Sequence, residues 1–246
     1  MKPTTRRRLV LLWLLLPVGL LAFHYGPGRR HAQRETAAIL VQQARAAGQS
    51  QEWAAAVALY AKAVQALPPD AGDDRVLLSV AHADARIYLG ELPEALAELE
   101  ELLRTAPVQQ PAVAAHVRAA LAEAEYYTAW LMRLEGAEPD EWDTEAAAAR
   151  QQFRFLAEAH SAAGTAGIGA YHTNLEASIR LALMDDAELK ALPLPAKIGN
   201  CENVSQKIRK QRATQQREQK TANEGEEREQ DVRNAGMGER PEETGS

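Results

Sequence analysis

Residues 53–68 read WAAAVALYAKAVQALP, and this stretch decides the fold. Small and large apolar residues recur at steps of three and four, which places them on one face of a helix. The members of this face are Trp53, Ala56, Tyr60, Ala63 and Leu67. Alanine lets a neighbouring helix approach closely, and the aromatic rings fill the space beside it. Pro68 cannot continue a helix, so the sequence predicts a helix that ends there.

A second copy of this pattern follows at a period of 39 residues. Its members are Leu92, Ala95, Leu99, Leu102 and Pro107, which repeat the order of Trp53, Ala56, Tyr60, Ala63 and Pro68. A further helix is predicted before each copy, over residues 34–48 and 73–89. One such hairpin cannot bury its own apolar face, so the sequence predicts several hairpins that stack into a continuous core.

The order of aromatic, small, aromatic, small and proline resembles the second helix of a tetratricopeptide repeat. The resemblance covers residues 34–107 well and 111–190 weakly. Ser79 and Arg86 replace two aromatic residues of the family pattern, whereas Ala83 keeps the small residue. The resemblance implies a right-handed solenoid of antiparallel helix pairs, with a concave groove for a peptide or a partner helix. It implies no reaction.

Three more helices are predicted after the repeated unit. Residues 111–135 and 141–160 form a third, longer pair, and residues 168–190 form a final helix. One face of that final helix is mostly polar, as expected of a helix that closes the end of a stack. We therefore expect an all-α, tetratricopeptide-like solenoid domain over residues 31–196, preceded by one transmembrane helix and followed by a disordered tail.

Residues 9–25 read LVLLWLLLPVGLLAFHY and contain no charged residue. A helix of this length spans about 26 Å, near the short limit for crossing a bilayer. Positions that define this predicted transmembrane helix are Leu9, Trp13, Pro17 and Tyr25. A cleaved signal peptide is an alternative, but the run is long and lacks an Ala-x-Ala end, so we favour an uncleaved signal anchor within a 1–30 segment.

Basic residues on the two sides of this run predict its orientation. Lys2 and Arg6 to Arg8 precede the run, and three arginines follow it up to Arg34. The small excess before the run favours a cytoplasmic N-terminus. For a Gram-negative source, this places the chain in the inner membrane as a single-pass protein with its bulk in the periplasm.

Apolar residues become rare after Ala196, and residues 197–246 are expected to be a disordered, charged tail. Residues 203–220 hold six Lys/Arg and one Glu. This basic half could bind an anionic membrane or the acidic body, or form a transient helix over 204–217, with a solvated linker as the plainest alternative. Cys201, the only cysteine, is interpreted as an incidental thiol at the edge of the tail, or as a link between two chains.

Charge and motifs argue against nucleic-acid binding and against catalysis. The chain carries a formal net charge of −6, and residues 31–196 hold twelve basic and twenty-four acidic residues, whereas nucleic-acid affinity needs clustered cations. No pair among the six histidines has the i, i+4 spacing of a helical zinc site. We therefore expect no catalytic residues, no cofactor and no metal.

The predicted function is that of a membrane-anchored adaptor or scaffold for a protein partner in the cell envelope. Tyr126, Tyr127 and Trp130 cannot all point the same way, so one or two are candidates to line a partner groove, with simple packing as the alternative. A second candidate function is a periplasmic holdase-type chaperone, whose groove would bind unfolded chains without selectivity. The sequence does not distinguish the two.

Overall fold

The computed structural model describes Trp13 and residues 28–105, 110–163 and 168–235, and in these ranges every regular element is a helix. The bounds are α2 (Arg29–Gln49), α3 (Trp53–Ala66), α4 (Gly72–Leu89), α5 (Leu92–Thr105), α6 (Pro111–Leu134), α7 (Pro139–Ala163), α8 (Ile168–Leu183), α9 (Asp186–Ala191), a 3-10 turn η2 (Ala196–Ile198) and α10 (Val204–Ala235). The predicted all-α class is confirmed for this part of the chain.

The predicted membrane helix falls almost wholly outside these ranges. Leu9, Pro17 and Tyr25 are not among the described residues, and neither is Pro107 of the second repeat. None of the helices in the described ranges combines the length and the apolar character that crossing a bilayer requires.

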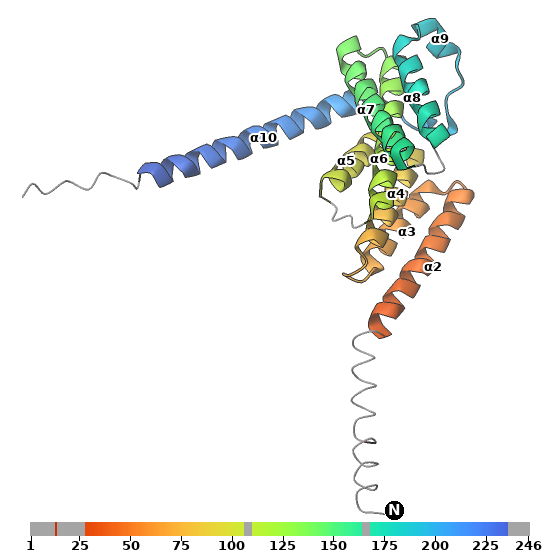
Figure 1. Ribbon diagram of the computed structural model, residues 1–246, viewed down its shortest axis with the longest axis vertical. Coiled ribbons are helices and arrows are strands. Elements are labelled where there is room, and N and C mark those ends of the chain that lie inside the picture. The colour runs from red at the N-terminus through yellow and green to blue at the C-terminus, as the bar shows by residue number, and fades with distance from the viewer. Residues whose placement is uncertain (1–12, 14–27, 106–109, 164–167, 236–246) are drawn as a thin grey trace, which may run out of the picture.

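Consecutive helices pack against one another from α2 to α8, and α4 also contacts α6 (Figure 1). This arrangement of adjacent helix pairs is compatible with a helical repeat fold. The predicted final helix over 168–190 is in fact two helices, because the first ends at Leu183 and a second begins at Asp186. Asp185 begins the second of them by accepting a hydrogen bond from the backbone N–H of Glu188 at 2.7 Å.

The organising helix, α3, buries the face that its spacing predicts. Ala56 and Ala63 are 1% and 0% exposed, and Pro68 is fully buried at the turn that follows. Trp53 is half-buried and stacks on Tyr88 of α4, with ring centroids 4.1 Å apart. The alanines therefore set the close approach of the helices, and the aromatic ring fills the gap beside them.

The second copy of the pattern lies in the largest core cluster. Leu92, Ala95 and Leu99 on α5 are at most 1% exposed, and Ala83 on α4 is fully buried. Leu102 is half-buried and packs against the same cluster. The period of 39 residues thus corresponds to equivalent buried faces on α3 and α5.

The predicted boundary at residue 196 is wrong for the residues that follow it. Ile198, Cys201, Val204 and Ile208 are all buried in the core cluster shared by α4, α5 and α6. Rather than a disordered tail with an incidental thiol at its edge, this segment supplies apolar side chains that complete the core. Four apolar residues in eleven were too sparse a pattern to predict packing, although each is well buried.

Polar contacts hold the same segment against the body. Lys197 makes ion pairs with Asp84 of α4 and Glu123 of α6, the second at 2.9 Å. Burial opposes the charge on Lys197, but these two carboxylates outweigh it and raise its pKa to about 12. The side-chain amide of Asn200 donates to the carbonyl oxygen of Tyr88 at 2.8 Å.

Glu135, just after α6, caps the first turn of α10. Its carboxylate accepts hydrogen bonds from the backbone N–H of Val204 at 2.8 Å and from the N–H and hydroxyl of Ser205 at 2.7 Å. These free N–H groups carry the positive end of the helix dipole, so the carboxylate stabilises the helix start. Beyond its base, α10 projects away from the body (Figure 1).

The base of α10 is also held by charge against α7. Arg209 pairs with Glu141 and Arg212 pairs with Glu145. The hydrogen bond from Arg209 holds the pKa of Glu141 below its ordinary value. The basic half of the predicted tail therefore binds the acidic body in this structure, which is one of the alternatives that the sequence left open.

Candidate functional site

The three predicted groove residues on α6 take part in packing. Trp130 is 7% exposed and meets Tyr126 edge-on, with ring centroids 5.7 Å apart. Tyr127 packs against the cluster of α4 and α5, whereas Tyr126 packs against residues of α7 and α8. The three rings thus diverge, as the sequence predicts, and none of them lines the hollow described below.

An apolar hollow lies between the first half of α6 and the second half of α7. Its volume is about 470 Å³. The lining residues are Pro111, Ala112, Ala114, Ala115, Arg118, Phe155, Leu156, Ala159 and His160. The alanines of both helices create this space, because their small side chains leave the neighbouring Phe155 uncovered on one side. Phe155 remains 53% exposed, which is unusual for so large an apolar ring.

Arg118 forms the polar edge of the hollow. Its guanidinium lies over the ring of Phe155, 4.3 Å from the centroid, and donates to the side-chain oxygen of Gln152. Among the described residues, no carboxylate lies within ion-pair distance of Arg118. The guanidinium is thus oriented beside an apolar surface and is able to accept a carboxylate from a ligand.

His160 fixes the opposite edge of the hollow. Its Nδ1 lies 3.0 Å from the carbonyl oxygen of Leu156, which selects the tautomer that donates from Nδ1. The imidazole packs against Tyr171 of α8, with ring centroids 4.6 Å apart. Both edges of the hollow are therefore held in place by contacts within the fold.

Glu125 lies two helical turns beyond Arg118 on α6 and is only 5% exposed. Burial, reinforced by the charge of Glu100 on α5, raises the pKa of Glu125 to about 8, and Arg118 opposes the shift. Its Oε2 atom has no hydrogen-bond partner. A carboxyl group in these surroundings is protonated at neutral pH, which removes the cost of burying a charge.

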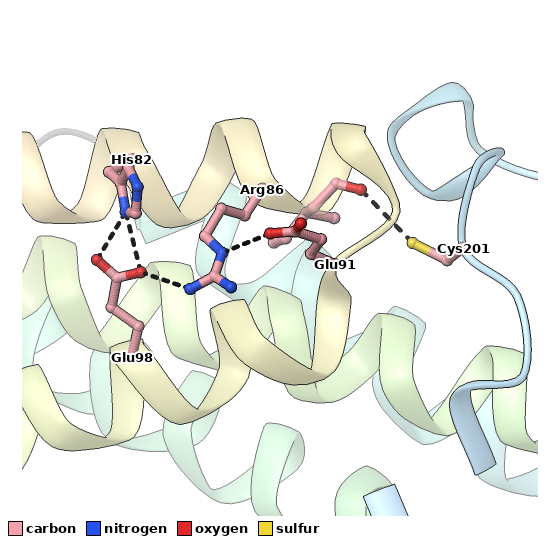
Figure 2. Close-up of polar contacts among 6 residues, drawn as sticks. His82, Arg86, Glu91, Glu98 and Cys201 are labelled. Carbon is pink, nitrogen blue, oxygen red and sulfur yellow. Dashed lines mark hydrogen bonds and ion pairs between the residues drawn. The ribbon is translucent and has the colours of Figure 1, made fainter. Parts of the chain in front are cut away.

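A second polar cluster joins α4 to α5 (Figure 2). His82 Nδ1 lies 2.9 Å from Glu98, and Arg86 pairs with Glu91 at 2.8 Å and with Glu98 at 3.5 Å. Arg86 stands where the repeat pattern has an aromatic residue. Its ion pair with Glu98 links α4 directly to α5.

The cluster of α4 and α5 does not form a metal site. Within the described ranges, no group of three or more His, Cys, Asp or Glu side chains is placed to hold a metal ion. Cys201 lies near this cluster, with Sγ 3.5 Å from the carbonyl oxygen of Ile87 (Figure 2). Burial raises the pKa of the Cys201 thiol, which makes it a poor nucleophile.

Sequence reasoning missed the hollow of α6 and α7. Arg118 and Phe155 lie on different helices, and neither belongs to a local motif. The available signal was the group of alanines at 112, 114 and 115 on α6 and at 159 on α7, since small residues on two helices leave room between them. Glu125 gave no signal, because nothing in its local sequence marks it as buried.

Comparisons with known proteins found no matching family model, curated protein or solved structure. The resemblance to tetratricopeptide repeats therefore rests on the residue pattern, and the packing of adjacent helix pairs is compatible with a helical repeat fold.

Proposed function

We propose that the chain is a membrane-anchored, tetratricopeptide-like adaptor that binds a segment of a protein partner in the hollow between α6 and α7. The observation that carries the proposal is an apolar hollow of about 470 Å³ beside a half-exposed phenylalanine and an arginine that pairs with no carboxylate of the described residues. A large apolar side chain on a partner would cover Phe155. A neighbouring carboxylate on the same partner would bind Arg118.

The chemistry of the hollow favours a selective site over a general one. A surface that binds any unfolded chain needs only apolar area, whereas Arg118 adds a charge of fixed position at one edge. The helices of the hollow are also well packed, with Ala149, Phe153 and Leu156 of α7 at most 3% exposed. A rigid, charged edge suits an adaptor with one partner better than it suits a holdase.

The N-terminal run would give this adaptor its location. The charge-free residues 9–25 and the basic residues before them support an inner-membrane anchor with the body in the periplasm. Anchoring would raise the local concentration of the hollow near membrane and envelope partners, so that a modest affinity is sufficient.

A photo-crosslinking amino acid at position 155 of the full-length chain, in intact membranes, tests the proposal. We expect one discrete adduct that is lost when Arg118→Glu is introduced. The same photo-crosslinker at Ile39, a half-exposed residue on α2, is the matched control and should not give that adduct. A broad smear of adducts that Arg118→Glu leaves unchanged would favour the holdase function and contradict the adaptor, as would the absence of any adduct specific to position 155.

A further inference from the structure

The segment between α9 and η2 is a short stretch of polyproline II helix. Residues 192–195 read LPLP. Leu192 has φ −77° and ψ 140°, and Pro195 has φ −58° and ψ 135°, so both lie close to the ideal polyproline II conformation. The ring of Pro193 fixes its φ in the same range, and Leu194 is directed to extended backbone because a proline follows it. All four residues therefore share one conformation.

This polyproline II segment is anchored at both ends. Before it, Leu189 of α9 is 1% exposed, and its carbonyl oxygen accepts a hydrogen bond from the N–H of Leu192 at 3.2 Å. After it, Ile198 is fully buried, and its N–H donates to the carbonyl oxygen of Pro195 at 3.1 Å. A segment fixed by two prolines and two buried anchors loses little conformational freedom when it binds a partner.

The segment presents apolar side chains and unpaired carbonyl groups to solvent. It runs along the outer edge of the body (Figure 1). Leu192 and Leu194 are 40% and 43% exposed, and Pro193 between them is exposed as well. The carbonyl oxygens of these three residues take part in no backbone hydrogen bond of the described residues. With three residues per turn, neighbouring side chains point in different directions and form separate ridges rather than a flat patch.

We propose that residues 192–195 bind, as a polyproline II helix, in an aromatic-lined groove of another protein. Aromatic rings that stand side by side leave slots in which the ridges of leucine and proline fit, and this is the general mode in which polyproline II segments are recognised. Tryptophan and tyrosine in such a groove also carry an N–H or an O–H, which is able to donate to the unpaired carbonyl oxygens.

The same features argue against other modes of binding. Pro193 and Pro195 have no N–H, and the N–H of Leu192 already donates to Leu189. Only Leu194 keeps a backbone donor, which is too few for the segment to add as a strand to a sheet edge.

A partner surface of aliphatic side chains alone would cover the leucines but leave the buried carbonyl groups without donors, which costs free energy. An aromatic-lined groove with hydrogen-bond donors satisfies both requirements. The segment lies outside the hollow of α6 and α7, and the inference does not depend on the function proposed for that hollow.

A diazirine amino acid at position 194 of the full-length chain, in permeabilised cells, tests the proposal. We expect one discrete adduct with another protein. The peptide acetyl-ALPLPAK-amide, which copies residues 191–197, should abolish the adduct in excess, whereas acetyl-ALGLGAK-amide should not. The same photo-crosslinker at Leu77, a 38% exposed leucine on α4, is the matched control and should not give that adduct.

Two variants separate the backbone conformation from the side chains. P193A/P195A keeps both leucines but frees the backbone, and it should lower the yield of the adduct at least about fivefold. Leu192→Ser keeps both prolines and removes one apolar ridge, and it should also lower the yield. Thermal unfolding verifies that both variants are folded. Failure to form an adduct from position 194, an adduct between two copies of this chain, an adduct unchanged in both variants, or equal competition by the two peptides would each overturn the proposal.

Discussion

Replacing Ile208 by alanine tests whether the base of α10 belongs to the folded core. Ile208 is 2% exposed and packs with Ile198, Cys201 and Val204 against α4, α5 and α6. If the segment were a solvated tail, as its composition predicts, the substitution would leave the free energy of unfolding unchanged. In the structure, the alanine loses the buried surface of three carbon atoms and leaves a cavity behind.

The expected loss of stability follows from this burial. Substitution of a fully buried isoleucine by alanine costs about 2–5 kcal/mol, and we expect about 3 kcal/mol at position 208 because the segment lies at the edge of the core. In a chain of this size, each 1 kcal/mol lowers the midpoint of thermal unfolding by about 2–4 °C. The midpoint should therefore fall by roughly 6–12 °C.

Urea unfolding of the full-length protein in mild detergent, followed by circular dichroism at 222 nm, measures the change. Ile39→Ala is the matched control, since the same atoms are removed from a side chain that is 50% exposed, and it should cost less than about 1 kcal/mol. Equal and small effects of the two substitutions would refute the docking of α10.

Two further substitutions test the buried carboxyl group and the contact between Gly90 and residue 200. Glu125 has a pKa of about 8 in the folded chain against an ordinary value of 4.5, so the folded state retains a proton that the unfolded state releases. The free energy of unfolding should therefore fall as the pH rises from about 5 to 8, and Glu125→Gln should reduce that slope in urea titrations at several pH values. Gly90 has φ +97°, and a Cβ there would lie 2.4 Å from the carbonyl oxygen of Asn200, so Gly90→Ala should cost about 2 kcal/mol or more in thermal unfolding. Gly136→Ala, at φ +74° with nothing within 4 Å of the added Cβ, should cost only about 1 kcal/mol, and equal losses would contradict the contact.

The helices of the body were predictable because their signals are local. Pro68, Gly90 and Pro111 mark helix boundaries in the sequence, and the predicted helix over 73–89 matches α4 within one residue at each end. The apolar spacing of three and four then selects the buried face of each helix. Gly48 marked the end of the first helix less exactly, because α2 continues to Gln49.

The docking of residues 197–208 was not predictable, because its contacts are long-range. Lys197 reads as one more charge in a polar tail, yet it pairs with acids on α4 and α6. Val204 and Ile208 are two apolar residues one turn apart in a polar helix, which is too little for an amphipathic pattern. Their burial depends on a surface formed by helices more than seventy residues earlier.

The hollow of α6 and α7 escaped prediction for a related reason. Phe155 is an apolar ring of the type that usually packs in a core. The structure leaves it 53% exposed because the alanines around it leave space between α6 and α7. Which apolar residue stays uncovered is decided by the number and order of neighbouring helices, and no local pattern carries that information.

The contacts of Asn200 and Cys201 with the end of α4 also affect the order in which the chain can fold. Their hydrogen bonds join residues 112 and 114 positions apart. In a simple helical stack each hairpin contacts only its neighbours, so it is able to pack on the preceding hairpin as it leaves the ribosome. Here the contacts at the end of α4 need residues that are translated much later. The apolar surface of α4, α5 and α6 that residues 198–208 cover therefore stays exposed on the nascent chain until residue 208 has emerged. Docking of residues 198–208 on this surface is then the last step of folding. A ribosome that stalls before residue 208 leaves a chain whose helices have formed but whose core is still exposed to water.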